Sequence, residues 1–253
     1  MTNKHQSEVH RLEENLQLLK LTCIKEQYRP AADKAARQNW DHLGYLARLV
    51  QAEADARHDR SILRRIKMAR FPGMKTMENF DWTWPTKINR PAIQNLFRLG
   101  FMKDKANIII LGGVGLGKSH IATALGYSAC LEKHSVLFAT TIDVINTLSA
   151  AQAAHKLKTE LRKYVNPELL ILDELGYLPI DKQGADLLFQ VISQRYEQKS
   201  TILTTNRAFK NWPEVFNNDS TLTSAMLDRL LHHAEIILIE GKSYRMKDQI
   251  QEQ

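Results

Sequence analysis

The sequence has few cysteines and no long apolar run. Only Cys23 and Cys130 occur among 253 residues, and their spacing matches no metal-binding or disulfide pattern. We therefore expect free thiols in a reducing compartment. No apolar run approaches the about 18–20 residues of a membrane span. The polar start of the chain, MTNKHQSEVHRLEENLQ, contains no signal-peptide core. These absences predict a cytoplasmic protein without a membrane partner.

Glycine and proline are also scarce in the first part of the chain. Residues 1–71 contain one glycine, Gly44, and one proline, Pro30, and they are rich in residues that favour helices. Apolar side chains follow helical spacing over residues 12–21 and again from about Trp40 onward. We predict a small all-helical N-terminal domain over residues 1–71, which could dock a partner or DNA.

Residues 72–253 have a different texture. They begin with a connector rich in proline, glycine and aromatics, PGMKTMENFDWTWPTKINRPAI. Short apolar runs then alternate with segments long enough for helices, which predicts an α/β fold with a parallel sheet covered on both faces. The expected strands are residues 107–111, 135–140, 169–173, 201–205 and 235–240. The formal net charge of +7 favours an anionic partner such as nucleic acid.

A glycine-rich stretch, LGGVGLGKSH, follows the first of these strands. Gly112, Gly117, Lys118 and Ser119 have the G-x-x-x-x-G-K-S spacing of a Walker A motif. The glycines let the backbone N–H groups curl around phosphates, and the following helix adds its positive end. We expect Lys118 to reach the β- and γ-phosphates and Ser119 to bind Mg²⁺. The predicted nucleotide-binding residues are Gly112, Gly113, Val114, Gly115, Leu116, Gly117, Lys118, Ser119 and His120.

Two acidic residues lie at the end of the apolar run that begins at residue 169, within ELLILDELGYLP. At the carboxyl end of a parallel strand, Asp173 can hold Mg²⁺ through water and Glu174 can activate water as a general base. This pair favours Mg²⁺-dependent ATP hydrolysis over phosphoryl transfer to a small acceptor. Asn206, at the end of TILTTN, could orient the attacking water or simply cap the next turn.

Arginines and histidines near the end of the chain are harder to interpret. Arg229, on an amphipathic helix, and Arg245, after the last strand, could stabilise transition-state charge, or could be ordinary solvated residues. His232 and His233 have no carboxylate or cysteine at metal-ligand spacing in the sequence, so we interpret them as structural or surface residues.

The motifs together resemble the AAA+ ATPases, in the branch of the insertion-sequence helper IstB and the helicase loader DnaC. The resemblance rests on GGVGLGKSH, LLILDELGYLP, TTN and LDRLLHHAEIILIEGKSYR, and covers about residues 72–253. It implies that Asn206 is sensor 1, that Arg229 is an arginine finger for a neighbouring subunit, and that Arg245 is sensor 2. Since eight residues follow Arg245, we expect no sizeable C-terminal lid.

The resemblance also implies a function. It is that of an ATP-dependent transposition helper, which forms a homo-oligomer on target duplex DNA and recruits or activates the transposase encoded alongside. One alternative is a DnaC-like loader that delivers a helicase to single-stranded DNA. Another is a nucleotide-sensing adaptor whose hydrolysis is incidental.

Two basic stretches are candidate DNA contacts. The first places Arg57, Arg60, Arg64 and Lys67 on one helical face, and the second contains Lys156, Lys158, Arg162 and Lys163. Proteins related to DnaC place an extra helix in the second region, which faces DNA. Either stretch could instead be a solvated face. Neither has the interleaved aromatics of a single-strand platform, which favours duplex DNA. We expect Trp82 and Trp84 to pack against the ATPase core.

Overall fold

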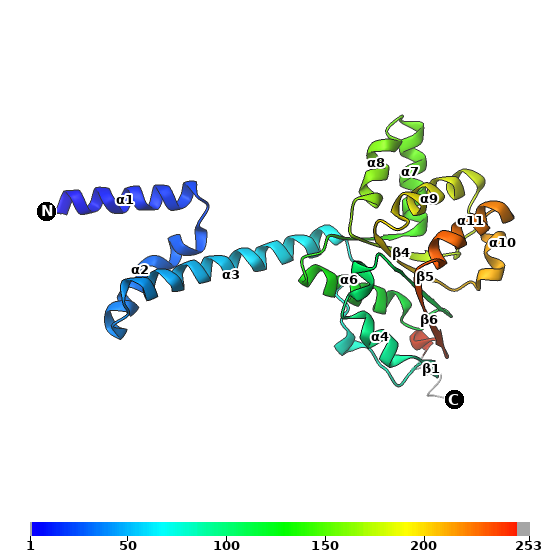
Figure 1. The fold of residues 1–253 in the computed structure, drawn as a ribbon, viewed down its shortest axis with the longest axis horizontal. Helices are drawn as coiled ribbons and strands as arrows, with labels where there is room; N and C mark the ends of the chain where they lie inside the picture. Colours follow the sequence, from blue (N-terminus) through cyan, green and yellow to red (C-terminus); the bar gives the residue numbers. More distant parts are fainter. Residues whose placement is uncertain (1, 247–253) are drawn as a thin grey trace. The chain divides into compact units, whose positions relative to one another are not determined.

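The chain contains two compact units in a computed structural model that describes residues 2–246 (Figure 1). The units are Met1–Arg64 and Arg65–Gln253. The division falls inside a long helix, α3 (His42–Ala69), and therefore lies before the boundary that the composition suggests after residue 71. The end of α3 belongs to the second unit because Ala69 is fully buried in its core.

The first unit is all-helical, as the sequence predicts. It contains α1 (Thr2–Leu18), α2 (Thr22–Gln38) and most of α3. The carboxylate of Glu53, on α3, is buried and accepts hydrogen bonds from the first backbone N–H groups of α2, Cys23 at 2.8 Å and Ile24 at 3.1 Å. These N–H groups have no partner within their own helix, so Glu53 fixes the start of α2 against α3.

A six-stranded sheet forms the centre of the second unit, with the strand order β1-β6-β2-β5-β4-β3. The strands are β1 (Lys87–Ile88), β2 (Asn107–Gly112), β3 (Val136–Thr140), β4 (Leu169–Leu175), β5 (Ser200–Thr205) and β6 (Ala234–Glu240). Strands β2 to β6 are parallel and confirm the predicted strands. The two-residue β1 was not predicted. It lies in the connector and pairs antiparallel with β6.

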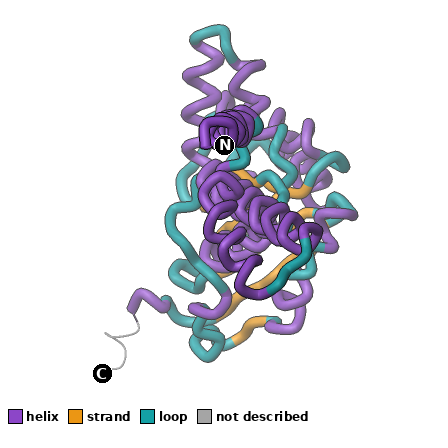
Figure 2. The backbone as a smooth tube through the Cα atoms, turned by 90° about the vertical axis from the view of Figure 1, so that its left-hand side faces the viewer, coloured by secondary structure: helices purple, strands orange, loops and turns teal. Residues whose placement is uncertain are grey.

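Helices cover both faces of this sheet (Figures 1 and 2). The helices are α4 (Arg90–Leu96), α5 (Gly100–Lys103), α6 (Lys118–Leu131), α7 (Thr141–Ala153), α8 (Leu157–Val165), α9 (Lys182–Arg195), α10 (Trp212–Val215) and α11 (Ser220–Leu231). Consecutive strand residues point to opposite faces: Leu170 packs with α7, α9 and α11, whereas Ile171 packs with α4 and α6.

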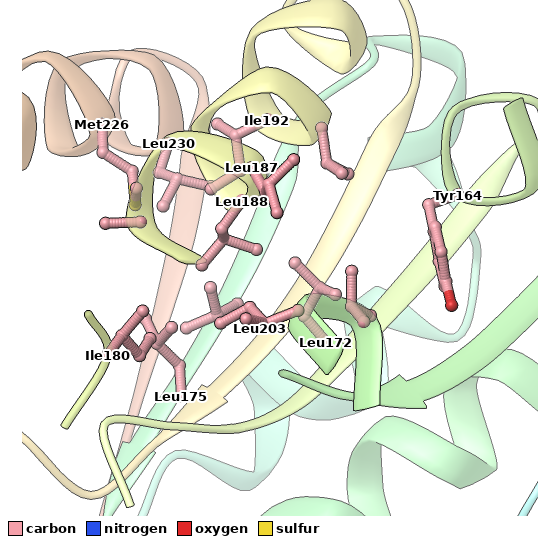
Figure 3. Packing of buried hydrophobic residues seen from close by; sticks show 14 of the residues in the cluster. Tyr164, Leu172, Leu175, Ile180, Leu187, Leu188, Ile192, Leu203, Met226 and Leu230 are labelled. Atoms are coloured by element: carbon pink, nitrogen blue, oxygen red, sulfur yellow. The ribbon is translucent and has the colours of Figure 1, made fainter. Parts of the chain in front are cut away.

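Figure 3 shows the first of these two cores from close by. Leu188 of α9 and Leu230 of α11 lie over Leu172 of β4 and Leu203 of β5. All four side chains are buried, so the two helices hold the carboxyl ends of β4 and β5 in a fixed arrangement. Among the helices of residues 2–246, none combines the length and apolar character needed to cross a membrane.

The two free thiols lie in contrasting environments. Cys23 is half-buried, whereas Cys130 is fully buried in α6, where burial raises the pKa of its thiol to about 11. Since only the thiolate reacts, about one Cys130 thiol in 1,000 is reactive at pH 8. We expect a disulfide reagent to modify one equivalent of thiol quickly in the native protein and the second only in denaturant.

The variant Cys23→Ser provides the control for this assignment. It should leave a single thiol that reacts slowly until the protein is denatured. Two fast equivalents in the native wild-type protein would contradict the burial of Cys130.

Candidate nucleotide-binding and catalytic site

The glycine-rich loop connects β2 to α6, which is the strand–loop–helix order that the motif requires. Gly117 has a φ of 88°, and a Cβ atom there would lie 2.6 Å from the ring of Phe80. At Gly112, a Cβ atom would lie 2.5 Å from the carbonyl oxygen of Ile239 in β6. Side chains at these positions would therefore displace either the loop or its neighbours.

The side chain of Lys118 folds back onto its own glycine-rich loop. Its Nζ donates a hydrogen bond of 2.6 Å to the carbonyl oxygen of Gly113. Burial lowers the pKa of Lys118, and the charges of Asp173 and Glu174 oppose this shift. The ammonium group therefore lies within electrostatic range of both predicted acidic residues.

Asp173 brings the loop and two strands together. Its carboxylate is 6% exposed and accepts hydrogen bonds from Ser119 Oγ at 2.9 Å and from Thr204 Oγ1 at 2.5 Å. A hydroxyl and a carboxylate side by side supply the oxygen ligands that Mg²⁺ prefers. These residues therefore fit the predicted magnesium site.

Glu174 follows in an unusual backbone conformation. Its φ is 61°, and the pairing of β4 with β5 shifts register between Leu172 and Leu175. The Glu174 N–H donates to Thr204 Oγ1 at 3.0 Å, while the side chain is exposed and lines the cavity beside the loop. A left-handed non-glycine residue costs about 1–3 kcal/mol, so the surrounding contacts must hold it in place.

Thr204 is a site residue that the sequence motifs did not identify. One hydroxyl group contacts both acidic residues, accepting from Glu174 and donating to Asp173. The available signal was its position two residues before Asn206 in TTN, near the end of a fully buried strand. Nothing in the sequence shows which carboxylate that strand faces.

The predicted residues converge on a cavity of about 320 Å³. Its lining includes seven of the nine predicted loop residues, from Val114 to His120, together with Glu174, Asn206 and Arg245. Arg245 is held there by its neighbour, since the Tyr244 N–H donates to the carbonyl oxygen of Gly115 at 2.9 Å. The segment after β6 is therefore attached directly to the phosphate loop.

An aromatic side of the cavity comes from the connector and the end of the chain. Trp84 and Tyr244 both line it, with ring centroids 5.6 Å apart in an edge-to-face arrangement, and Trp84 Nε1 donates to the Lys242 carbonyl oxygen at 2.9 Å. Both tryptophans therefore pack within the ATPase unit, as expected: Trp82 on Phe80 in the core, and Trp84 on Tyr244 at the cavity. His120 also lines the cavity, with Nε2 2.7 Å from the carbonyl oxygen of Thr76.

Arg229 does not line this cavity. Its Nη1 donates to the carbonyl oxygen of Ala225 at 2.8 Å, and its guanidinium lies 4.8 Å from the centre of the Phe189 ring. Arg229 therefore does not reach the cavity of its own chain in this structure.

The two basic stretches differ in their partners. Arg57 and Arg60 both pair with Glu53, at 3.1 and 3.0 Å, and donate further bonds within the helical unit, so they stabilise a helix junction. On α8, Lys158 and Arg162 are exposed, four residues apart, and no ion pair within residues 2–246 involves either of them. Lys163 lies 5.3 Å from the centre of the Tyr164 ring.

The parallel sheet, the phosphate loop at its edge and the acidic pair on β4 define a P-loop nucleotide-binding protein of the AAA+ class. Solved AAA+ proteins share this fold. A DnaC helicase loader aligns with a TM-score of 0.56 at 21% identity, over 65% of this chain and 96% of that one. DnaA from Aquifex aeolicus, bound to AMPPCP, aligns with a TM-score of 0.57 at 20% identity, over 73% of this chain and 57% of the DnaA chain.

Within this class, the chain belongs to the family described as IstB-like ATP binding proteins, whose sequence profile matches residues 14–252. It is 39% identical to the ATP-binding protein of insertion sequence IS232 from Bacillus thuringiensis subsp. berliner, over 98% of this chain and 97% of the relative. It is also 39% identical to the ATP-binding protein of IS21 from Pseudomonas aeruginosa, over 95% of this chain and 90% of that relative. The family predicted from the motifs is confirmed.

Proposed function

We propose that this protein is a Mg²⁺-dependent ATPase that assembles on target duplex DNA and recruits or activates a transposase. The observation that carries the ATPase part is the contact of Ser119 with Asp173 beside Glu174, at the mouth of the phosphate loop. The transposition part rests on relatives that match this chain over nearly its full length and are named as ATP-binding proteins of insertion sequences.

The proposed reaction is attack of water on the γ-phosphorus of ATP. Glu174 accepts the proton of the water while the bond from the γ-phosphorus to the bridging oxygen breaks, giving ADP and phosphate. Lys118 binds the β- and γ-phosphates, and Asn206 orients the water. Ser119 and Asp173 would hold Mg²⁺, which neutralises phosphate charge when bound. Arg245, inside the cavity, stabilises the charge of the γ-phosphate.

The proposed assembly is a homo-oligomer in which Arg229 completes a neighbour's site. Support comes from its place outside its own cavity, near the end of α11, where its guanidinium packs on the Phe189 ring. An arginine supplied by another subunit makes hydrolysis depend on assembly.

The proposed DNA contact is α8 and the residue before it, with Lys156, Lys158, Arg162 and Lys163. Leu161 and Tyr164 bury the opposite side of this helix in the core, so its basic side faces outward. The Arg57 and Arg60 part of the other stretch is less suited, because Glu53 neutralises part of its charge.

We expect the double variant Lys158→Gln, Arg162→Gln to bind duplex DNA more weakly than the wild-type chain in the presence of a non-hydrolysable ATP analogue. The slope of log affinity against log salt concentration should become shallower by about 0.9 for each phosphate that the variant no longer neutralises. Fluorescence anisotropy at several salt concentrations measures both quantities. The matched control is Lys103→Gln, Lys105→Gln, which removes the same charge from exposed positions at the end of α5.

The same titration, made with duplex and single-stranded DNA of equal length, separates the alternatives. Nucleotide-dependent binding that favours duplex and forms large complexes supports the transposition helper. A preference for single strands would instead indicate a helicase loader. An absence of DNA binding in every nucleotide state would contradict the proposal and leave the adaptor function.

A further inference from the structure

We propose that Glu197, His232 and His233 form a binding site for a divalent transition-metal ion such as Zn²⁺. In residues 2–246 these side chains form a group whose ligand atoms all lie within 4.8 Å of one another. None of the three lines the nucleotide cavity. The proposal therefore does not depend on the ATPase function.

The distances between ligand atoms are close to those of a coordinated ion. Glu197 Oε1 lies 3.7 Å from His232 Nδ1 and 3.4 Å from His233 Nε2. A tetrahedral zinc ion with bonds of about 2.0–2.1 Å separates its ligands by about 3.3–3.4 Å. A ring nitrogen binds a metal in the plane of its ring, so the two stacked histidine rings would have to turn out of their stack before both nitrogens point at one ion.

The backbone that carries Glu197 is held in place by the buried hydrogen bonds of Arg195. Glu197 lies in the turn between α9 and β5, two residues after Arg195, which is 1% exposed. Arg195 donates to the carbonyl oxygens of Tyr164 at 3.0 Å and Pro167 at 2.8 Å, and to the hydroxyl of Thr201 at 3.0 Å. The turn therefore starts from an anchored residue.

The backbone that carries the histidines is fixed as well. His232 is the C-cap of α11 and its N–H donates to the carbonyl oxygen of Asp228 at 3.1 Å. The carbonyl oxygen of His233 accepts from the Asn107 N–H, at the start of β2, at 2.7 Å. The two imidazole rings stack with centroids 4.1 Å apart. Ligands on fixed backbone segments lose little freedom when an ion binds.

The hydroxyl group of Tyr196 competes with a metal ion for the Nδ1 atom of His232. The hydroxyl lies 2.6 Å from His232 Nδ1, so an ion must displace that hydrogen bond. The three ligand side chains are about half exposed, which leaves the fourth position of the ion to water. We therefore expect micromolar affinity, weaker than that of a buried four-ligand site.

The ligand set selects the class of ion. Two imidazole nitrogens and one carboxylate oxygen favour Zn²⁺, Co²⁺, Ni²⁺ and Cu²⁺ over Mg²⁺ and Ca²⁺, which prefer oxygen ligands only. A bound ion would link the turn after α9 to the end of α11. Because it binds the folded chain, it should raise the thermal unfolding midpoint by about 5–10 °C at a hundredfold excess over Kd.

The test is calorimetric titration of the metal-free full chain with Zn²⁺, without nucleotide, followed by titration with Co²⁺ monitored by visible absorption. We expect one Zn²⁺ per chain and intense cobalt bands typical of tetrahedral coordination. Mg²⁺ should give no heat at this site.

The variants Glu197→Gln and His233→Asn should each weaken Zn²⁺ binding by at least about tenfold, since even the loss of an outer-shell partner costs that much. Circular dichroism before titration shows whether each variant is folded. The control is His10→Asn, which removes another exposed histidine, located 3.3 Å from Glu14. Affinity only in the millimolar range, or binding that His233→Asn leaves unchanged in a folded chain, would overturn the proposal.

Discussion

Replacing Glu174 by glutamine is expected to lower steady-state ATP hydrolysis by about 10²–10⁴-fold, the usual contribution of a general base. The amide has nearly the shape of the carboxylate but cannot accept a proton from water. Glu174 carries its side chain into the cavity, and its backbone is held by Thr204, so the substitution should leave the site otherwise intact. Nucleotide affinity should change little.

Phosphate release and the binding of a fluorescent ATP analogue measure the two expectations separately. Glu132→Gln, at the C-cap of α6, is the matched control, because it changes the same charge at an exposed position outside the cavity. A Glu174→Gln chain that hydrolyses ATP at the wild-type rate would remove the proposed base and, with it, the proposal that this chain is a dedicated ATPase.

Thr204→Val should reduce kcat by about 10–100-fold, because a hydrogen bond to a charged group is worth about 1.5–3 kcal/mol. Valine has nearly the volume of threonine but gives no hydroxyl to the Asp173 carboxylate and leaves the Glu174 N–H without its acceptor. Both acidic residues then lose a hydrogen bond that helps to hold them in position, although Asp173 keeps the one from Ser119. Thr204→Ser, which keeps the hydroxyl, should restore most of the rate.

The measurements for Thr204 are kcat, KM and the Mg²⁺ concentration at half-maximal rate. We expect kcat to fall and the Mg²⁺ requirement to rise, with a smaller effect on KM. Thr223→Val is the control for a merely structural effect. Its hydroxyl is also buried and bonded, to the backbone carbonyl oxygen of Asp219 at 2.6 Å, but it lies outside the cavity. Equal losses of stability with equal losses of kcat in both variants would contradict a specific role for Thr204.

The class of fold and the centre of the site could be predicted from the amino-acid order alone. Short hydrophobic runs form the strands of a parallel sheet, because burial on both faces requires continuous apolar sequence. The Walker A residues and the Asp173–Glu174 pair were also predictable, because phosphate and magnesium binding depend on local backbone shape and on strand ends. These features arise from neighbours in the chain.

Contacts between distant residues became visible only in the folded molecule. Folding pairs the two-residue strand β1 with β6 and places Trp84 beside Tyr244 at the cavity. In the same way it brings Thr204 to Asp173. No periodicity in the sequence predicts these contacts, because each depends on how the strands and helices are arranged in space.

The histidine pair illustrates the difference most directly. From the sequence, His232 and His233 have no acidic neighbour at ligand spacing, whereas the packing of α9 against α11 brings Glu197 within 3.4 Å of His233. Local sequence therefore specifies the elements and the phosphate loop, through short-range hydrogen bonding and apolar spacing. Side-chain groupings across the sheet and between helices come from long-range packing, which a single sequence does not encode in any local pattern.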